Sequence, residues 1–123
     1  MRKGQVFYFL AVAVIFIASA EGCAYAKKDI VQAPCVISDT VSYAKNIAPV
    51  ISTNCFACHS AASNVSGILL DSYDALKFWA DNGYLYGTVS HGAGYKPMPD
   101  GGGKLSDCNI ALIKKWIDKG TPQ

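Results

Sequence analysis

Residues 55–59 read Cys55-Phe56-Ala57-Cys58-His59, and the rest of the chain is best interpreted from this C-x-x-C-H stretch. C-x-x-C-H is the attachment signature of a c-type haem. In such a site both thiols form thioether bonds to the haem vinyl groups, and the adjacent histidine binds the iron from the proximal side. The sequence therefore predicts one covalently bound haem c, attached at Cys55 and Cys58, with His59 as an axial ligand.

Two other kinds of site also use closely spaced cysteines. A structural zinc site needs a fourth ligand at matching spacing. A dithiol redox site of the thioredoxin kind needs a βαβ context around the two cysteines. The sequence shows no such context, which favours the haem interpretation.

The N-terminus has the features of an export signal. Arg2 and Lys3 form a positive start, and residues 6–20 are an unbroken run of apolar and small residues. That run is too short to span a bilayer comfortably, but it is typical of a signal peptide. Residues 1–26 are therefore predicted to be a signal peptide, and the protein is expected to be exported to the periplasm, where bacteria attach haem c.

Two processing sites compete in this segment. Ala24-Tyr25-Ala26 is an A-x-A cleavage site, which would release a soluble chain starting at Lys27. Alternatively, Gly22-Cys23 resembles the end of a lipobox, in which case the signal ends at residue 22 and Cys23 is lipidated. The residues before Gly22 match that motif poorly.

The chain has five cysteines, and an odd number in an exported protein needs an explanation. Haem attachment uses two, and Cys23 is either lipidated or removed. A disulfide between the remaining Cys35 and Cys108 is the economical assignment in an oxidising compartment. Two free buried thiols are the alternative.

Length and charge limit the functional classes. The 123 residues are enough for one domain with one core. The formal net charge is only +2, with no clustered basic face in the sequence, so nucleic acid is not an expected partner. Strong electrostatic steering of a redox partner is not expected either.

Apolar spacing predicts an all-α domain over residues 42–123, preceded by an extended leader over residues 27–41. No alternating run typical of strands stands out. Helical segments are expected within 42–54, with the firm part beginning near Pro49, and over 71–82, 84–89 and a stretch capped by Ser106. Residues 92–103 hold five glycines and two prolines and are expected to form a loop.

That loop contains the best candidate for a second axial ligand. Met98 follows the haem motif, stands between Pro97 and Pro99, and precedes the last helix. The prolines restrict the backbone on either side of it. His91 is a rival ligand, or else a histidine near the haem edge. Coordination by His59 and Met98 would raise the reduction potential and favour electron shuttling.

Several further motifs show a family resemblance. They lie at residues 47–49 (IAP), 55–59 (CFACH), 67–73 (GILLDSY), 98–99 (MP), 105–107 (LSD) and 116–120 (WIDKG). Over about residues 43–122 the chain resembles bacterial class I (mono-haem) cytochrome c domains, particularly the planctomycete-type subset also common in Bacteroidetes.

The resemblance implies a compact cytochrome c fold, with three to five short helices around one haem and the first and last helices crossing beside it. Similar small chains often begin with a lipidated Gly-Cys, which favours Cys23 as a membrane anchor, and carry cysteines near positions 35 and 108. One departure is Ser60, where many class I domains have glycine, so the path of the loop after His59 is not predicted.

The leading functional hypothesis is an exported electron carrier between a donor and an acceptor redox protein, with no catalytic residue and no enzyme activity. The alternative is a haem-based peroxidase or gas sensor in which the sixth ligand is labile. A docking module of a larger periplasmic assembly is a third class.

Overall fold

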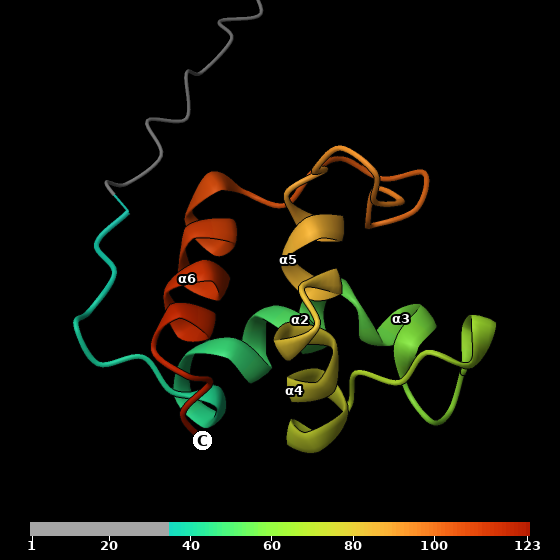
Figure 1. The fold of residues 1–123 in the computed structure, drawn as a ribbon. Coiled ribbons are helices and arrows are strands. Elements are labelled where there is room, and N and C mark those ends of the chain that lie inside the picture. Colours follow the sequence, from blue (N-terminus) through green and yellow to red (C-terminus); the bar gives the residue numbers. More distant parts are fainter. Residues whose placement is uncertain (1–34) are drawn as a thin grey trace, which may run out of the picture. The chain divides into compact units, whose positions relative to one another are not determined.

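The computed structural model describes residues 35–123, so the predicted signal peptide, Cys23 and residues 27–34 of the leader lie outside the described part. Residues 35–123 are helical and contain no strand (Figure 1), which confirms the all-α prediction at this level. None of their helices is long and apolar enough to cross a membrane. The elements are η1 (Tyr43–Ile47), α2 (Ala48–Asn54), α3 (Phe56–His59), η2 (Val65–Gly67), α4 (Tyr73–Asp81), α5 (Tyr84–Val89) and α6 (Asp107–Asp118).

The first helical segment has two parts. The Ser42 hydroxyl accepts from the Lys45 backbone N–H, and a π-helical turn, η1, follows it. The regular helix α2 then begins with Pro49 in its first turn, as predicted, because proline lacks a backbone N–H and an N–H in the first turn would have no partner within the helix. Ile47 and Ile51 are buried on one face, so this segment supplies one wall of the core.

Helices α4 and α5 form the next part of the core. The Ser72 hydroxyl accepts from the Ala75 N–H at 3.3 Å and starts α4, whose Leu76 and Ala80 are buried. Gly83, at φ +81°, takes the left-handed conformation that separates the two helices. Helix α5 covers residues 84–89, as the sequence predicts.

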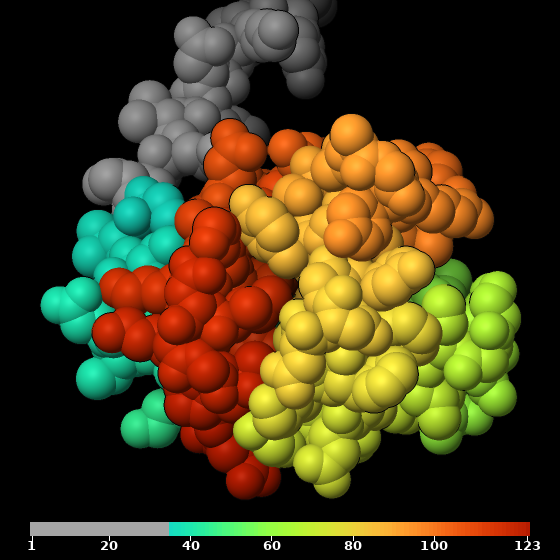
Figure 2. Space-filling model, in the orientation of Figure 1, coloured from blue at the N-terminus to red at the C-terminus, as the bar shows by residue number. Residues whose placement is uncertain are grey.

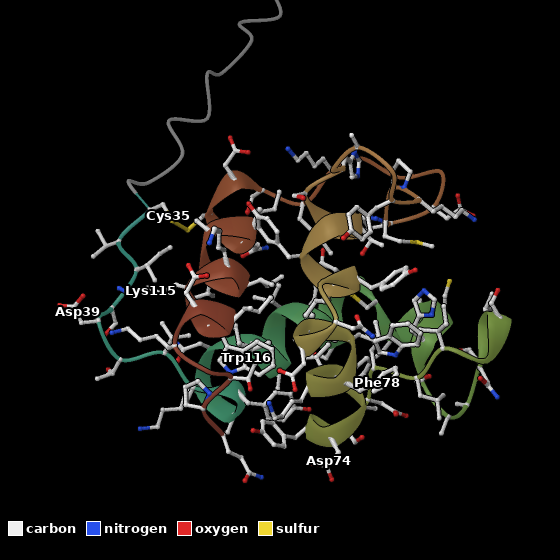
Figure 3. The ribbon with its side chains drawn as sticks, in the orientation of Figure 1. Cys35, Asp39, Asp74, Phe78, Lys115 and Trp116 are labelled. Atoms are coloured by element: carbon white, nitrogen blue, oxygen red, sulfur yellow. A yellow bond between two sulfur atoms is a disulfide. The ribbon has the colours of Figure 1, made fainter. Side chains whose placement is uncertain are left out.

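Helix α6 begins and packs as predicted. The Ser106 hydroxyl accepts from the Asn109 N–H at 3.2 Å. Spacings of three residues place Ile110, Ile113 and Trp116 on one buried face of the helix. Trp116 is fully buried and points from α6 into the core (Figure 3).

The end of the chain returns to its first helix. The rings of Tyr43 and Trp116 lie 6.3 Å apart, centroid to centroid. Pro122 O accepts from both the Trp116 Nε1–H and the Tyr43 backbone N–H, each at 2.8 Å. Gly120, at φ +81°, makes the turn that allows this. These contacts hold η1 and α6 together.

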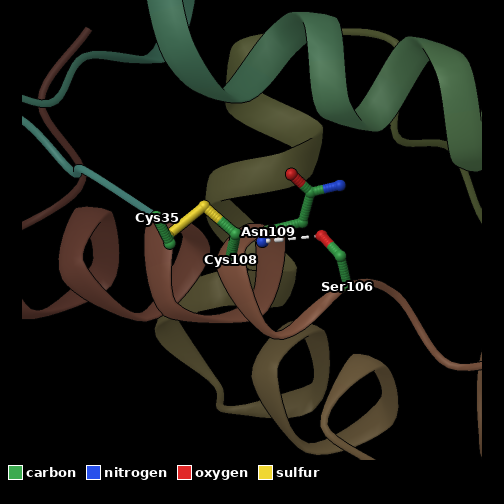
Figure 4. The surroundings of a disulfide bond; sticks show 4 residues. All are labelled: Cys35, Ser106, Cys108 and Asn109. Carbon is green, nitrogen blue, oxygen red and sulfur yellow. Dashed lines mark hydrogen bonds between the residues drawn. A yellow bond between two sulfur atoms is a disulfide. The ribbon is translucent and has the colours of Figure 1, made fainter. Parts of the chain in front are cut away.

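The segment before η1 is attached to α6. Cys35 and Cys108 form a disulfide with their Cα atoms 5.5 Å apart (Figure 4), so the two cysteines are not free thiols here. Residues 35–41 contain no helix. The Lys115 Nζ lies 3.2 Å from an Asp39 carboxylate oxygen (Figure 3). This exposed ion pair adds little, so the segment is attached chiefly by the disulfide and by Val41, which is buried in the core, with Ile37 packed beside it.

Candidate functional site

The C-x-x-C-H stretch forms a single helical turn directly after α2. The Cys55 N–H continues the ladder of α2 by donating to Ile51 O at 2.8 Å. The Cys55 carbonyl then accepts from the Cys58 and His59 N–H groups at 3.1 and 2.9 Å. This turn places Cys58 and His59 in α3 and Cys55 at the position just before it.

Both thiols of the motif are free, and their surroundings differ. Cys58 is exposed, whereas Cys55 is half-buried, and burial raises the pKa of the Cys55 thiol to about 11. Reactive thiols of redox C-x-x-C motifs have a lowered pKa instead. Within residues 35–123, no three His, Cys, Asp or Glu side chains gather in a way that could hold a metal ion.

The His59 ring is held by a backbone carbonyl. Its Nδ1 lies 3.2 Å from Ile68 O, and because a carbonyl can only accept, Nδ1 carries the proton. With Nδ1 engaged in this way, Nε2 is the ring nitrogen left to bind a metal ion. Sequence reasoning missed the role of Ile68, because a backbone carbonyl has no side-chain signature.

The loop after His59 is closed at its base. The Leu70 N–H donates to His59 O at 2.9 Å, and the Ala61 N–H donates to the Asp71 carboxylate at 2.6 Å. These two hydrogen bonds define the path of the loop after His59, which the sequence did not predict because Ser60 stands where many class I domains have glycine. They also bring Ile68 back beside His59.

The predicted haem contacts meet at one cavity of about 470 Å³, lined by Cys55, Cys58, His59 and Met98. Its other walls are mostly apolar and come largely from α4, α5 and the segments beside them, including Ile68, Leu70, Trp79, Leu85, Val89 and Leu105. A cavity of this size is typical of small-molecule and cofactor sites, which span about 300–1,000 Å³.

Met98 reaches this cavity from a loop that is fastened to α5. Its N–H donates to Thr88 O at 3.1 Å, and its side chain is half-buried. The rival ligand, His91, is not among the residues that line the cavity. Instead, its Nε2 lies 3.1 Å from Met98 O. The structure thus separates the two candidates for the sixth ligand.

Tyr95 packs this loop onto α5. A Cβ on Gly87 would lie 2.5 Å from the Tyr95 ring, so the ring covers the glycine closely. In the space-filling view, the orange atoms of the loop lie directly on those of the α5 segment (Figure 2). Only glycine at position 87 permits this approach.

We expect Gly87→Ala to lower the free energy of unfolding by about 1–2 kcal/mol, because the cost of displacing the Tyr95 ring exceeds the gain in helix propensity. Urea denaturation followed by circular dichroism measures this loss. Gly103→Ala is the matched control: its Cβ would meet nothing within 4 Å. That variant should stay within about 0.5 kcal/mol of the parent. Equal stability of the two variants would contradict the packing argument.

Comparison with protein-family models, curated proteins and solved structures finds no match to this chain.

Proposed function

We propose that this chain is an exported mono-haem c-type cytochrome that passes single electrons between redox-protein partners. One observation carries the proposal: Cys55, Cys58, His59 and Met98 all line the same cavity. They come from residues 55–59 and from a distant loop, so the C-x-x-C-H spacing alone does not bring Met98 there.

The residues fit a covalently bound haem. Two free thiols are available at the spacing needed for two thioether bonds. An imidazole with its Nδ1 engaged elsewhere and a methionine thioether supply one nitrogen and one sulfur ligand. The remaining walls are largely apolar, as a macrocycle requires.

When bound, the haem iron supplies the one-electron chemistry. Cys55 and Cys58 anchor the group, and His59 coordinates through Nε2 while Ile68 O fixes the ring. Met98 contributes the thioether that raises the reduction potential. The apolar walls exclude water from the iron. No residue of the chain has to act as acid, base or nucleophile.

We also propose that the helices of residues 35–123 form a cytochrome c fold. Support comes from the contact between η1 and α6, and from the order of the motif helix, the Met98 loop and the last helix. Export to the periplasm and membrane attachment through a lipidated Cys23 rest on the N-terminal sequence, which lies outside the described residues.

Intact mass of the protein, made with its own export signal in a bacterium that matures c-type cytochromes, tests the proposal. The expected mass includes one haem, lacks the two hydrogens lost when the Cys35–Cys108 disulfide forms, and includes a diacylglycerol group if Cys23 is lipidated.

The double variant Cys55→Ser, Cys58→Ser should contain no haem that stays attached to the protein after denaturation. Ala57→Ser, an exposed change inside the motif, should retain it. If Ala57→Ser lost its haem on denaturation to the same extent as the double cysteine variant, attachment through the thiols would be contradicted.

Absorption spectra distinguish the carrier from a peroxidase or gas sensor. A carrier should be low-spin in both oxidation states, show the thioether–iron band and bind no carbon monoxide. Rapid carbon monoxide binding by the unaltered protein would instead favour a sensor or peroxidase with a labile sixth ligand.

A further inference from the structure

The loop that carries Met98 is hydrogen-bonded to two adjacent backbone carbonyls near the end of α5. Thr88 O accepts from the His91 N–H at 3.2 Å and from the Met98 N–H at 3.1 Å. The neighbouring carbonyl of Gly87 accepts from the Gly92 N–H at 2.8 Å. Both ends of the loop are therefore attached to the same turn of α5.

His91 stands at the first end of this loop in an uncommon conformation. Its φ is +57°, in the left-handed region that residues other than glycine rarely adopt. Its ring reaches across the base of the loop, where Nε2 lies 3.1 Å from Met98 O. Because the carbonyl can only accept, Nε2 must donate.

The peptide groups on either side of the Met98 Cα are therefore each held by a hydrogen bond. Its N–H is bonded to Thr88, and its carbonyl is bonded to His91. Among the described residues, His91 provides the one hydrogen bond to the Met98 carbonyl. Turning either peptide would turn the Cα–Cβ bond and move the thioether away from the cavity.

We propose that His91 is a positioning residue for Met98: its Nε2–H holds the Met98 carbonyl and so keeps the thioether directed at the cavity. The proposal rests on the proposed function for the identity of the sixth ligand. It assigns His91 a role outside the coordination sphere. The imidazole retains the ligand without touching the iron.

Two substitutions separate the hydrogen bond from the backbone conformation. In His91→Gln, the amide nitrogen stands as far from Cα as Nε2 of histidine, so the donor is retained. In His91→Asn, the amide nitrogen corresponds to Nδ1 and does not reach Met98 O. Asparagine nevertheless tolerates a positive φ better than glutamine. A backbone effect and a hydrogen-bond effect therefore predict opposite orders for the two variants.

The first measurement is the affinity of ferric protein for added imidazole, which competes with Met98 for the iron. We expect His91→Asn to bind imidazole roughly threefold to tenfold more tightly, as loss of one exposed hydrogen bond implies. His91→Gln should stay within about twofold of the unaltered protein. Equal affinities in all three proteins, or a larger change in His91→Gln, would overturn the proposal.

The second measurement is amide hydrogen exchange at Met98, which requires no haem. We expect exchange to rise roughly threefold to tenfold in His91→Asn and not in His91→Gln. Unchanged exchange in His91→Asn would show that the hydrogen bond does not hold Met98 and would overturn the proposal. Equal acceleration in both variants, together with equal loss of thermal stability, would also overturn it, because His91 would then have only a structural role. Absence of haem from the unaltered protein would refute the proposed function, whereas the exchange result still decides the contact between His91 and Met98.

Discussion

Met98→Leu protein is expected to bind carbon monoxide in its ferrous state and to lack the thioether–iron band. The unaltered protein should show the band and bind no carbon monoxide. Leucine has nearly the volume of methionine, so the cavity wall is preserved while the sulfur is removed. Because a thioether ligand raises the reduction potential, the midpoint should fall by about 0.1–0.3 V, a fraction of the roughly 0.8 V range that axial ligands span. Spectroelectrochemical titration measures this shift.

Two further variants make that result interpretable. Met98→His should restore a low-spin, six-coordinate spectrum at a lower potential than the unaltered protein, because it supplies a different ligand from the same place. Lys104→Ala changes an exposed side chain that does not line the cavity, and should leave both spectrum and potential unchanged. A Met98→Leu protein with the unaltered spectrum would show that another group is the sixth ligand.

Replacing Cys35 and Cys108 by serine is expected to lower the free energy of unfolding by about 4 kcal/mol. The two residues are 73 positions apart in the sequence. Cross-linking so long a loop removes much conformational freedom from the unfolded chain, which places the effect near the upper end of the usual range for disulfides. Urea unfolding followed by circular dichroism, without reductant, measures the loss.

Neither cysteine of this pair lines the cavity, so the visible spectrum of the double variant should not change. Val36→Ala is a control beside Cys35: its side chain is 87% exposed, and its loss should cost no more than about 0.5 kcal/mol. A loss below about 1 kcal/mol in the double variant would mean that residues 35–41 are held mainly by other contacts.

Local signals account for the elements that were predicted well. Gly83 ends the α4 segment, and Ser106 marks the start of α6, because the conformation of the first and the hydroxyl of the second act within a few residues. The π-helical turn of η1 was not predicted. Apolar spacing does not distinguish it from an α-helix, and its geometry accompanies the packing of Tyr43 on Trp116.

The sequence likewise identifies some parts of the candidate site and not others. Side chains with distinctive chemistry, such as Cys55, His59 and Met98, could be selected from the sequence, and the structure brings them to one cavity. The carbonyls of Ile68 and Thr88, which orient His59 and Met98, could not be selected. Every residue has a carbonyl, and only the path of the loops decides which one lies within reach.

The Cys35–Cys108 disulfide also sets the route of mechanical load. Tension applied to the chain at residue 34 enters the described part at Cys35 and passes through a covalent bond into the first turn of α6. Residues 36–42 are then bypassed, and η1 is not pulled from its contact with Trp116. A pull from the N-terminal side would therefore strain the last helix before the first.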